Sequence, residues 1–230
     1  MNFAPSFLYP HLGSWQESLS PSKLKTGVRN KLNSNIGTYP TRRNIMGVFV
    51  ALEGIDLSGK TTTAKVLAER IGGVYYKTPS EEMAEARKIF NECGVGMAKY
   101  LFYLSTVAIA SYEIEELLKT TNVVVDRYLI STMCYHYQEG VKIDTVNINK
   151  MGIIDPHLNV CLTVNRRSWE VRQKERQEES DKGWLYWYDL SRVLKSFTRG
   201  KKGVVINTSN KISEETADCI VSELQARKLI

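Results

Sequence analysis

The segment with the clearest chemistry is glycine-rich and carries a lysine and a threonine at fixed spacing. Residues 54–61 read GIDLSGKT, which matches the pattern G-x-x-x-x-G-K-[ST]. Glycines let the backbone approach an anion closely, and the amide N–H groups at the start of a helix face the bound charge. We expect this segment to cradle the phosphates of a nucleotide, with Lys60 on the outer phosphates and the Thr61 hydroxyl on Mg²⁺. The predicted nucleotide-contacting residues are Gly54, Ile55, Asp56, Leu57, Ser58, Gly59, Lys60, Thr61 and Thr62.

A second group of residues that could take part in chemistry is Asp126-Arg127-Tyr128, which directly follows the run 122–125. A carboxylate at a strand end can hold Mg²⁺ or accept a proton, and the neighbouring guanidinium can form a fork onto an acceptor phosphate. Taken alone, this group is explained equally well by an ordinary ion pair. The intact phosphate loop upstream favours a function, so Asp126 and Arg127 are predicted catalytic residues and Asp126 a metal ligand with Thr61.

A third group is a run of basic residues on the predicted helix 167–180. Arg172 and Arg176 are four residues apart and therefore share one helix face, with acidic residues interleaved along the chain. Composition alone favours a solvated helix with salt bridges. The functional alternative is a mobile lid that brings both arginines over a phosphoryl group during its transfer and excludes water.

The elements that must position these residues alternate between strand and helix patterns. Such alternation indicates an α/β fold with a parallel sheet and helices on both faces, and ligands of such sheets bind beyond the carboxyl ends of the strands. The predicted strands are 47–53, 74–77, 122–126, 158–164 and 203–207. The predicted helices are 60–71, 80–92, 97–119, 128–138, 167–180, 184–198 and 213–227.

The composition separates a short tail from one domain. The chain has 230 residues, of which 43% are hydrophobic, and its net charge is +6. Residues 1–45 hold most of the basic surplus and four of the six prolines, so residues 46–230 are nearly neutral and predict no nucleic-acid-binding face. The tail is interpreted as a transit peptide, a flexible basic tail or a misassigned start before Met46, and we expect it to be disordered in each case. No apolar run approaches the roughly 20 residues that span a bilayer.

Other chemistries find little support. His136 and His157 have no partners at the spacing of a zinc site, and there is no G-x-S-x-G segment for serine hydrolysis. The four cysteines form no C-x-x-C pair and are predicted to be small buried groups in a reducing compartment. The long helix 97–119 is apolar over a broad surface, which suggests a homodimer, and it carries aromatic residues, among them Tyr103, that can stack on a base.

The glycine-rich loop, the Asp126-Arg127-Tyr128 group and the basic helix together resemble the thymidylate kinase family of P-loop nucleoside-monophosphate kinases, and the resemblance extends over residues 46–227. FVALEGIDLSGKTT resembles the opening strand and loop of that family, and DRYLISTMCYH resembles its D-R-Y segment, with Ser131 and Tyr135 in place. The resemblance implies a P-loop kinase fold with a five-stranded parallel sheet and a lid that carries Arg172 and Arg176. It also implies that Asp56 contacts the 3′-hydroxyl of the acceptor sugar.

Two departures from the family concern the acceptor side. Lys77 stands where the family commonly has an arginine after its second strand, and Ser105 and Thr106 stand where its long helix commonly carries Asp-Arg. A lysine can replace an arginine only as a point charge. The donor side is complete, so the departures bear on the identity of the acceptor. The predicted substrate-binding residues are Asp56, Lys77, Tyr103, Arg127 and Tyr135.

Three functions follow, in order of preference. The first is phosphoryl transfer that depends on ATP and Mg²⁺ and converts dTMP to dTDP, a step of nucleotide biosynthesis. The second keeps the donor site but phosphorylates a nucleoside or another small molecule. The third is a nucleotide-binding partner protein without kinase activity. The expected partners are small nucleotides, with no specific nucleic acid and no membrane, and the expected location is the cytoplasm, or an organelle such as the mitochondrion if residues 1–45 are a transit peptide.

Overall fold

The computed structural model describes residues 46–176 and 182–230, so the predicted tail over 1–45 lies outside the described residues. Five strands form one parallel sheet in the order β2-β3-β1-β4-β5, which confirms the predicted α/β architecture. Each predicted strand is present, and its ends differ from the prediction by two residues or fewer. The strands are β1 (Phe49–Gly54), β2 (Gly73–Lys77), β3 (Asn122–Asp126), β4 (Leu158–Thr163) and β5 (Val204–Asn207).

The central strand β1 is buried along its whole length, as expected for a strand between two helical layers. It pairs with β3 and β4, so that Val50 lies beside Val124 on one side and Leu158 on the other. Alternate residues of a strand point to opposite faces of the sheet. Val50 and Leu52 therefore belong to one core, and Phe49 belongs to the other. The burial of β1 explains the apolar sequence of its first four residues, Phe49–Leu52.

The helices also match the prediction closely, with three differences. The predicted helix 80–92 begins with a 3₁₀ turn at Glu81–Met83, two further turns at Ile143–Thr145 and Ile148–Lys150 were not predicted, and residues 177–180 of the predicted helix 167–180 lie outside the described residues. No helix within 46–176 and 182–230 combines the length and apolar character that a membrane crossing needs. The helices are α2 (Lys60–Arg70), α3 (Ala84–Glu92), α4 (Gly96–Leu117), α5 (Leu129–Gln138), α6 (Arg166–Arg176), α7 (Trp184–Gly200) and α8 (Ser213–Ala226).

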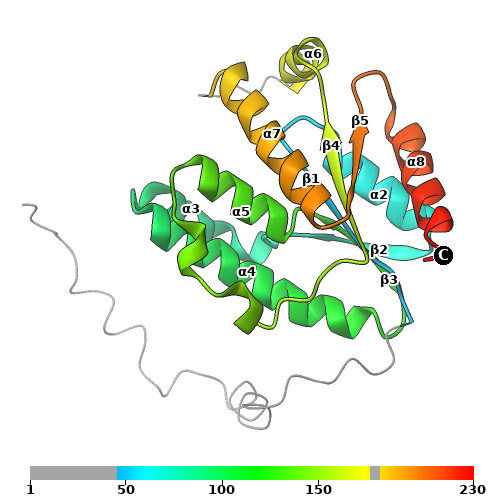
Figure 1. Cartoon of the computed structure of the whole chain (residues 1–230), viewed down its shortest axis with the longest axis horizontal. Helices are drawn as coiled ribbons and strands as arrows, with labels where there is room; N and C mark the ends of the chain where they lie inside the picture. Colours follow the sequence, from blue (N-terminus) through cyan, green and yellow to red (C-terminus); the bar gives the residue numbers. More distant parts are fainter. Residues whose placement is uncertain (1–45, 177–181) are drawn as a thin grey trace, which may run out of the picture. The chain divides into compact units, whose positions relative to one another are not determined.

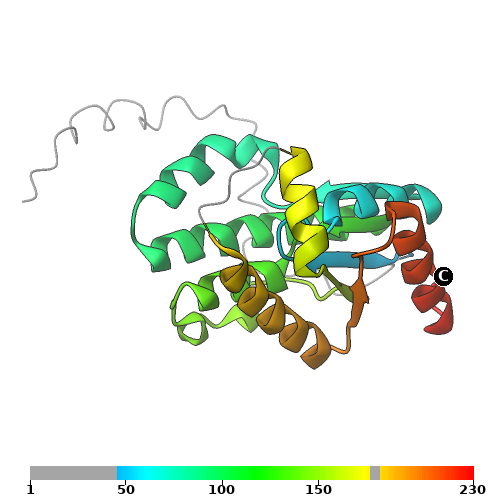
Figure 2. The ribbon, with the colours of Figure 1, turned by 90° about the horizontal axis from the view of Figure 1, so that it is seen from above.

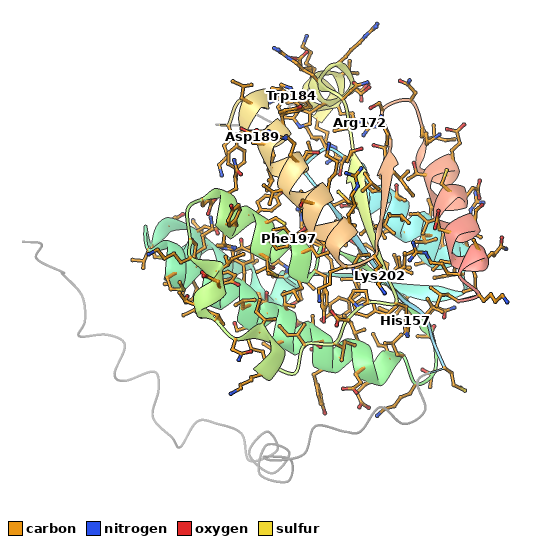
Figure 3. All side chains as sticks on the ribbon, in the orientation of Figure 1. His157, Arg172, Trp184, Asp189, Phe197 and Lys202 are labelled. Atoms are coloured by element: carbon orange, nitrogen blue, oxygen red, sulfur yellow. The ribbon has the colours of Figure 1, made fainter. Side chains whose placement is uncertain are left out.

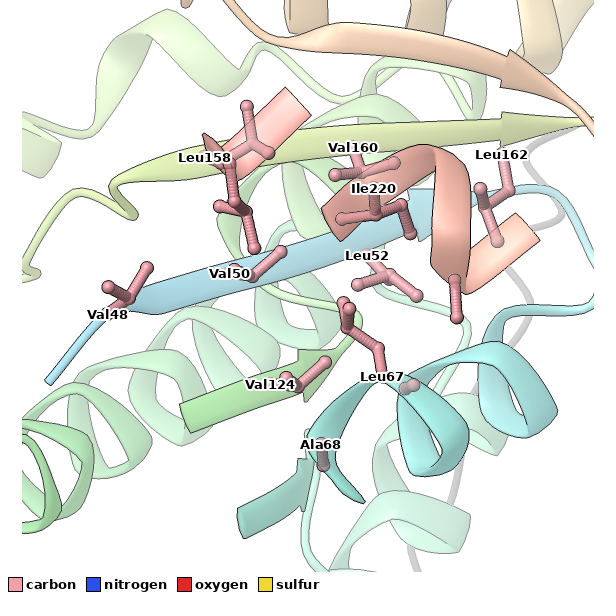
Figure 4. Packing of buried hydrophobic residues seen from close by; sticks show 13 residues of the cluster. Val48, Val50, Leu52, Leu67, Ala68, Val124, Leu158, Val160, Leu162 and Ile220 are labelled. Carbon is pink, nitrogen blue, oxygen red and sulfur yellow. The ribbon is translucent and has the colours of Figure 1, made fainter. Parts of the chain in front are cut away.

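Two helical layers cover the sheet. Helices α2 and α8 contact each other on one face, and α4, α5 and α7 cover the other, as the two views in Figure 1 and Figure 2 show. Figure 4 shows the first core, where Leu67 of α2 and Ile220 of α8 meet Leu52 and Val160 of the sheet. The prediction that all cysteines are buried is confirmed for Cys134 and Cys161. It is wrong for Cys93, which is exposed near the end of α3, and for Cys219 of α8, which is only half-buried.

The parallel topology brings the carboxyl ends of all five strands to one edge of the sheet, with β2 ending at Lys77. β1 leads into the glycine-rich loop, β3 into Arg127, β4 into α6 and β5 into Thr208. Because every strand runs in the same direction, these carboxyl ends meet where ligands of such sheets bind. Helix α6 lies beyond this edge, directly after β4 (Figure 1). Residues that are as much as 150 positions apart in the sequence thus come together in one site.

Candidate active site

The loop between β1 and α2 needs both glycines of its motif. Gly54 has φ +151°, and a Cβ atom there would lie 2.4 Å from the Leu162 carbonyl oxygen. Gly59 has φ +87° immediately before α2, a conformation that side chains disfavour. Leu57 also has a positive φ of 64°. The chain therefore makes a tight turn whose amides lead into the start of α2, the arrangement that holds anions.

Lys60 lies inside this loop. Its Nζ donates a hydrogen bond of 2.6 Å to the Ile55 carbonyl, and the side chain is buried. Burial and, to a smaller extent, the nearby Arg127 lower the pKa of Lys60, whereas Asp56 and Asp126 act in the opposite direction; the net pKa is about 8. An ammonium held by one carbonyl in such surroundings lacks a full counter-charge, so a polyphosphate would be a strong partner for it.

Thr61, in the first turn of α2, contacts Asp126 at the end of β3. The Thr61 hydroxyl donates to Asp126 Oδ2 at 2.5 Å. Asp126 is 3% exposed, and its other oxygen, Oδ1, has no hydrogen-bond partner among the described residues. An unpartnered buried carboxylate oxygen is costly, and hydroxyl and carboxylate oxygens are the ligands that Mg²⁺ prefers. The pair therefore fits a magnesium ion.

Arg127 is fixed in place by three acceptors. Its Nη2 forms an ion pair with Asp56, and its Nη1 donates to the Tyr135 hydroxyl at 3.0 Å and to the Gly54 carbonyl at 3.1 Å. The guanidinium also lies over the ring of Tyr135, 5.1 Å from its centroid. The residue has φ +66°, a strained value that these contacts hold. The guanidinium has more N–H groups than these contacts use, so it can still bind an anion.

A cavity of about 250 Å³ lies on this side of the loop. All five predicted substrate-binding residues line it, namely Asp56, Lys77, Tyr103, Arg127 and Tyr135. Lys77 also forms an ion pair of 2.8 Å with Glu81 at the surface. Thr106 lines the cavity without a charge, as its sequence position suggested. Two cations from neighbouring helices, Arg87 and Lys99, line the same cavity and were not predicted.

A second cavity, of about 200 Å³, lies on the other side of the loop. Leu57, Gly59 and Thr62 line it together with both predicted lid arginines, Arg172 and Arg176. Successive residues of one loop thus face different cavities, because Asp56 lines the first and Leu57 the second. The loop stands between two spaces, and each has basic residues in its lining.

Arg172 joins the lid helix to this loop. Its Nη1 donates to the Leu57 carbonyl at 2.9 Å, and its Nη2 donates to the Thr208 carbonyl at 2.6 Å. Figure 3 shows Arg172 on α6 beyond the end of the sheet. The Thr208 hydroxyl in turn donates to the Ser58 carbonyl at 2.9 Å. Thr208 was not predicted, because nothing in the sequence indicates a contact between the end of β5 and a loop so far upstream.

Glu53 is a further residue that sequence reasoning missed. It is fully buried at the end of β1 and accepts hydrogen bonds from the Ser131 hydroxyl and from the backbone N–H groups of Ile130 and Ser131. Burial raises its pKa, although these hydrogen bonds oppose the shift. The carboxylate binds the first turn of α5 to the strand before the loop. A charged residue inside the apolar run VFVALEG is the signal that could have revealed it.

Comparison with known proteins identifies the family of this chain. The family model described as thymidylate kinase matches residues 52–218. A probable thymidylate kinase of Methanococcus aeolicus is 32% identical over 202 residues, which cover 80% of this chain and 100% of that protein. A probable thymidylate kinase of Methanococcus vannielii is 33% identical over 183 residues, which cover 74% of this chain and 91% of that protein.

Two solved structures share the fold. The thymidylate kinase of Candida albicans superposes with a TM-score of 0.63 at 17% identity, covering 79% of this chain and 92% of that one. The thymidylate kinase of Ehrlichia chaffeensis superposes with a TM-score of 0.58 at 20% identity, covering 78% and 98%. The residues that the family model matches include the loop, the carboxyl ends of the strands and α6. The chain belongs to the thymidylate kinase family.

Proposed function

We propose that the two cavities beside the loop bind the two substrates of one phosphoryl transfer, from ATP to dTMP, which yields ADP and dTDP. The observation that carries this proposal is the position of the loop between the cavities. A phosphoryl group passing from one side to the other would lie against the loop's amides. Phosphoryl transfer is catalysed chiefly by positioning and by charge stabilisation, and fixed N–H groups and cations supply both.

On the donor side, the loop and the lid would hold ATP. Lys60 would exchange its contact with the Ile55 carbonyl for the outer phosphates, where its charge is better compensated. Arg172 already reaches the loop from α6, so its guanidinium is close to the place where charge develops on the transferred group. Arg176 lines the same cavity and would add a second cation.

We propose Mg²⁺ as the cofactor, held by Thr61 and Asp126. The unpartnered Oδ1 of Asp126 beside the Thr61 hydroxyl supports this assignment. When bound, the ion would neutralise charge on the donor phosphates. Asp126 has a second use in the same place, because a carboxylate at this strand end can orient an acceptor oxygen.

On the acceptor side, Arg127 would bind the phosphate of dTMP. Its contacts with Asp56, Tyr135 and the Gly54 carbonyl fix the guanidinium before the substrate arrives, which reduces the entropy lost on binding. Lys77 would act as an exposed point charge at the cavity mouth. Tyr103 would pack against the base, since it lines the cavity from α4. Arg87 would supply positive charge that Ser105 and Thr106 lack, whereas the charge of Lys99 is partly compensated by its ion pair with Glu139 in the same cavity lining.

A panel of acceptors with ATP and Mg²⁺ tests this function. We expect ADP release with dTMP as the acceptor. With thymidine, ADP release should be far slower, because thymidine offers no phosphate to Arg127. Coupled detection of ADP, with product identified by chromatography, gives both results. Rapid release with thymidine and none with dTMP would favour the nucleoside kinase, and tight ATP binding without ADP release for any acceptor would favour the inactive partner protein.

ATP affinity is expected to fall as the pH rises above about 8. The pKa of Lys60 in the free protein is about 8, and phosphates would raise it, so above pH 8 binding must take up a proton. The dissociation constant should then rise by up to about tenfold per pH unit until the pKa of the complex is reached. Calorimetry at pH 9 in two buffers with different ionisation enthalpies measures the uptake. The Lys60→Met variant should show none, and equal heats for the native chain would contradict the role of Lys60.

The homodimer remains a prediction, and so does the compartment. Leu101, Ile109 and Tyr112 are exposed on one side of α4, which supports association through this helix. The cytoplasm is the proposed location, with an organelle as the alternative if residues 1–45 direct import. Those residues lie outside the described part of the chain.

A further inference from the structure

His136 lines the acceptor cavity together with Tyr103 and Arg127. It lies on α5, is 3% exposed, and its Nδ1 is 2.6 Å from the carbonyl oxygen of Thr132. A carbonyl oxygen can only accept a hydrogen bond, so Nδ1 must carry the proton. In a neutral ring the other nitrogen, Nε2, then presents a bare lone pair. The helix itself therefore fixes which tautomer the cavity meets.

The lone pair on Nε2 has no hydrogen-bond partner among the described residues, although the atom is buried. Buried polar atoms without partners are rare and costly, and each calls for an explanation. The ring lies between Tyr100 and Tyr103, with centroids 5.1 and 5.3 Å away. Burial lowers the pKa of His136; the hydrogen bond to Thr132 and the charge of Glu139 act against this shift, and Lys99 adds to it. The neutral ring is the form that a substrate meets at neutral pH.

We propose that Nε2 of His136 accepts a hydrogen bond from the N3–H group of the acceptor's pyrimidine base. The proposal rests on the function proposed above. Thymine and uracil carry a proton on N3, whereas neutral cytosine carries a lone pair there. Two lone pairs facing each other in a dry cavity repel and leave both atoms unpartnered. His136 would therefore select thymine and uracil nucleotides against cytosine nucleotides.

The surroundings support a contact with a base. Tyr103 lines the cavity beside His136, so a planar ring that packs against Tyr103 comes near Nε2. The long helix offers no arginine at Ser105 or Thr106, and the base-facing polar group would come from α5 instead. The competing explanation is a structural one: the Tyr100 hydroxyl, which is likewise buried without a partner among the described residues, would donate to Nε2, and the histidine would serve stability alone.

The test compares the binding of dUMP and dCMP by calorimetry without ATP, so that it does not depend on catalysis. The native chain is expected to bind dUMP more tightly than dCMP, by about tenfold or more. This ratio reflects the hydrogen bond that dUMP makes with Nε2 and the two facing lone pairs that dCMP would leave without partners. His136→Phe keeps a ring of similar size without the acceptor nitrogen, and the preference should shrink to about twofold or less. His136→Gln carries an amide oxygen and should restore part of the preference.

Tyr137→Phe is the matched control, because Tyr137 is exposed on the same helix. It should bind both nucleotides as the native chain does. Thermal unfolding of all variants identifies those that fail to fold, and His136→Gln keeps the test open if His136→Phe does fail. An unchanged preference in the folded variants, even with lower thermal stability, would overturn the proposal and favour the contact with Tyr100. Tight dUMP binding without dTDP formation in the acceptor panel would instead refute the proposed function alone.

Discussion

Replacing Lys60 with alanine is expected to abolish turnover of dTMP, with a loss of about 10³-fold or more. Lys60 is the buried cation inside the phosphate loop, and its only hydrogen bond in the described part of the chain goes to the loop's own Ile55 carbonyl. The charge that the donor phosphates need would disappear with it. Coupled detection of ADP with dTMP as acceptor measures the loss.

The same variant is expected to fold normally. The lowered pKa of Lys60 shows that the folded state disfavours its charge, so removal of the ammonium relieves an unfavourable burial. Lys65→Ala is the matched control, since Lys65 lies exposed on the same helix. Its turnover should equal that of the native chain. Near-normal turnover in Lys60→Ala, with thermal unfolding unchanged, would show that the loop does not act as a donor site.

Replacing Arg172 with alanine is expected to lower kcat by about 10³-fold and to change the KM for dTMP little. The guanidinium reaches the Leu57 and Thr208 carbonyls from α6, so it lies at the loop beside the donor cavity. A cation placed there stabilises charge that develops during transfer more than charge in the bound substrates. Steady-state kinetics with both substrates varied separates kcat from KM.

Two further variants serve as comparisons for Arg172→Ala: the conservative replacement Arg172→Lys and the control Lys174→Ala on the same helix. The lysine keeps a charge but loses the fork that contacts two carbonyls, so an intermediate kcat is expected. Lys174 is exposed on the same helix, and its replacement should leave kcat unchanged. If Arg172→Ala retained the native kcat, Arg172 would hold the lid in place and would have no part in the transfer.

The sequence was sufficient to predict the architecture because the periodic apolar segments are strong. β1 and β3 are buried along nearly their whole length, and their unbroken apolar runs have no other good location than a covered sheet. The loop could be assigned from the sequence because the patterns of the first strand and the first helix flank its motif directly. The loop residues 54–62 and the pair Asp126 and Arg127 were therefore predicted from motifs at strand ends.

The remaining site residues depend on contacts that no local pattern records. Thr208 meets the loop through a hydrogen bond across 150 positions, and Glu53 meets α5 across more than 70. Arg87 reaches the acceptor cavity only because α3 is placed beside α4. The sequence gives His136 no partner at the spacing of a metal site, and its unpartnered Nε2 arises only from the packing of α5 in the fold.

The most direct measurement follows the phosphate itself. ATP labelled with ³²P at the γ position is incubated with dTMP, Mg²⁺ and the full chain, and the products are separated by chromatography. The account predicts that the label moves into the β-phosphate of dTDP in an amount equal to the dTMP consumed. Label that stays in ATP, or appears only as inorganic phosphate while dTMP is unchanged, would contradict it.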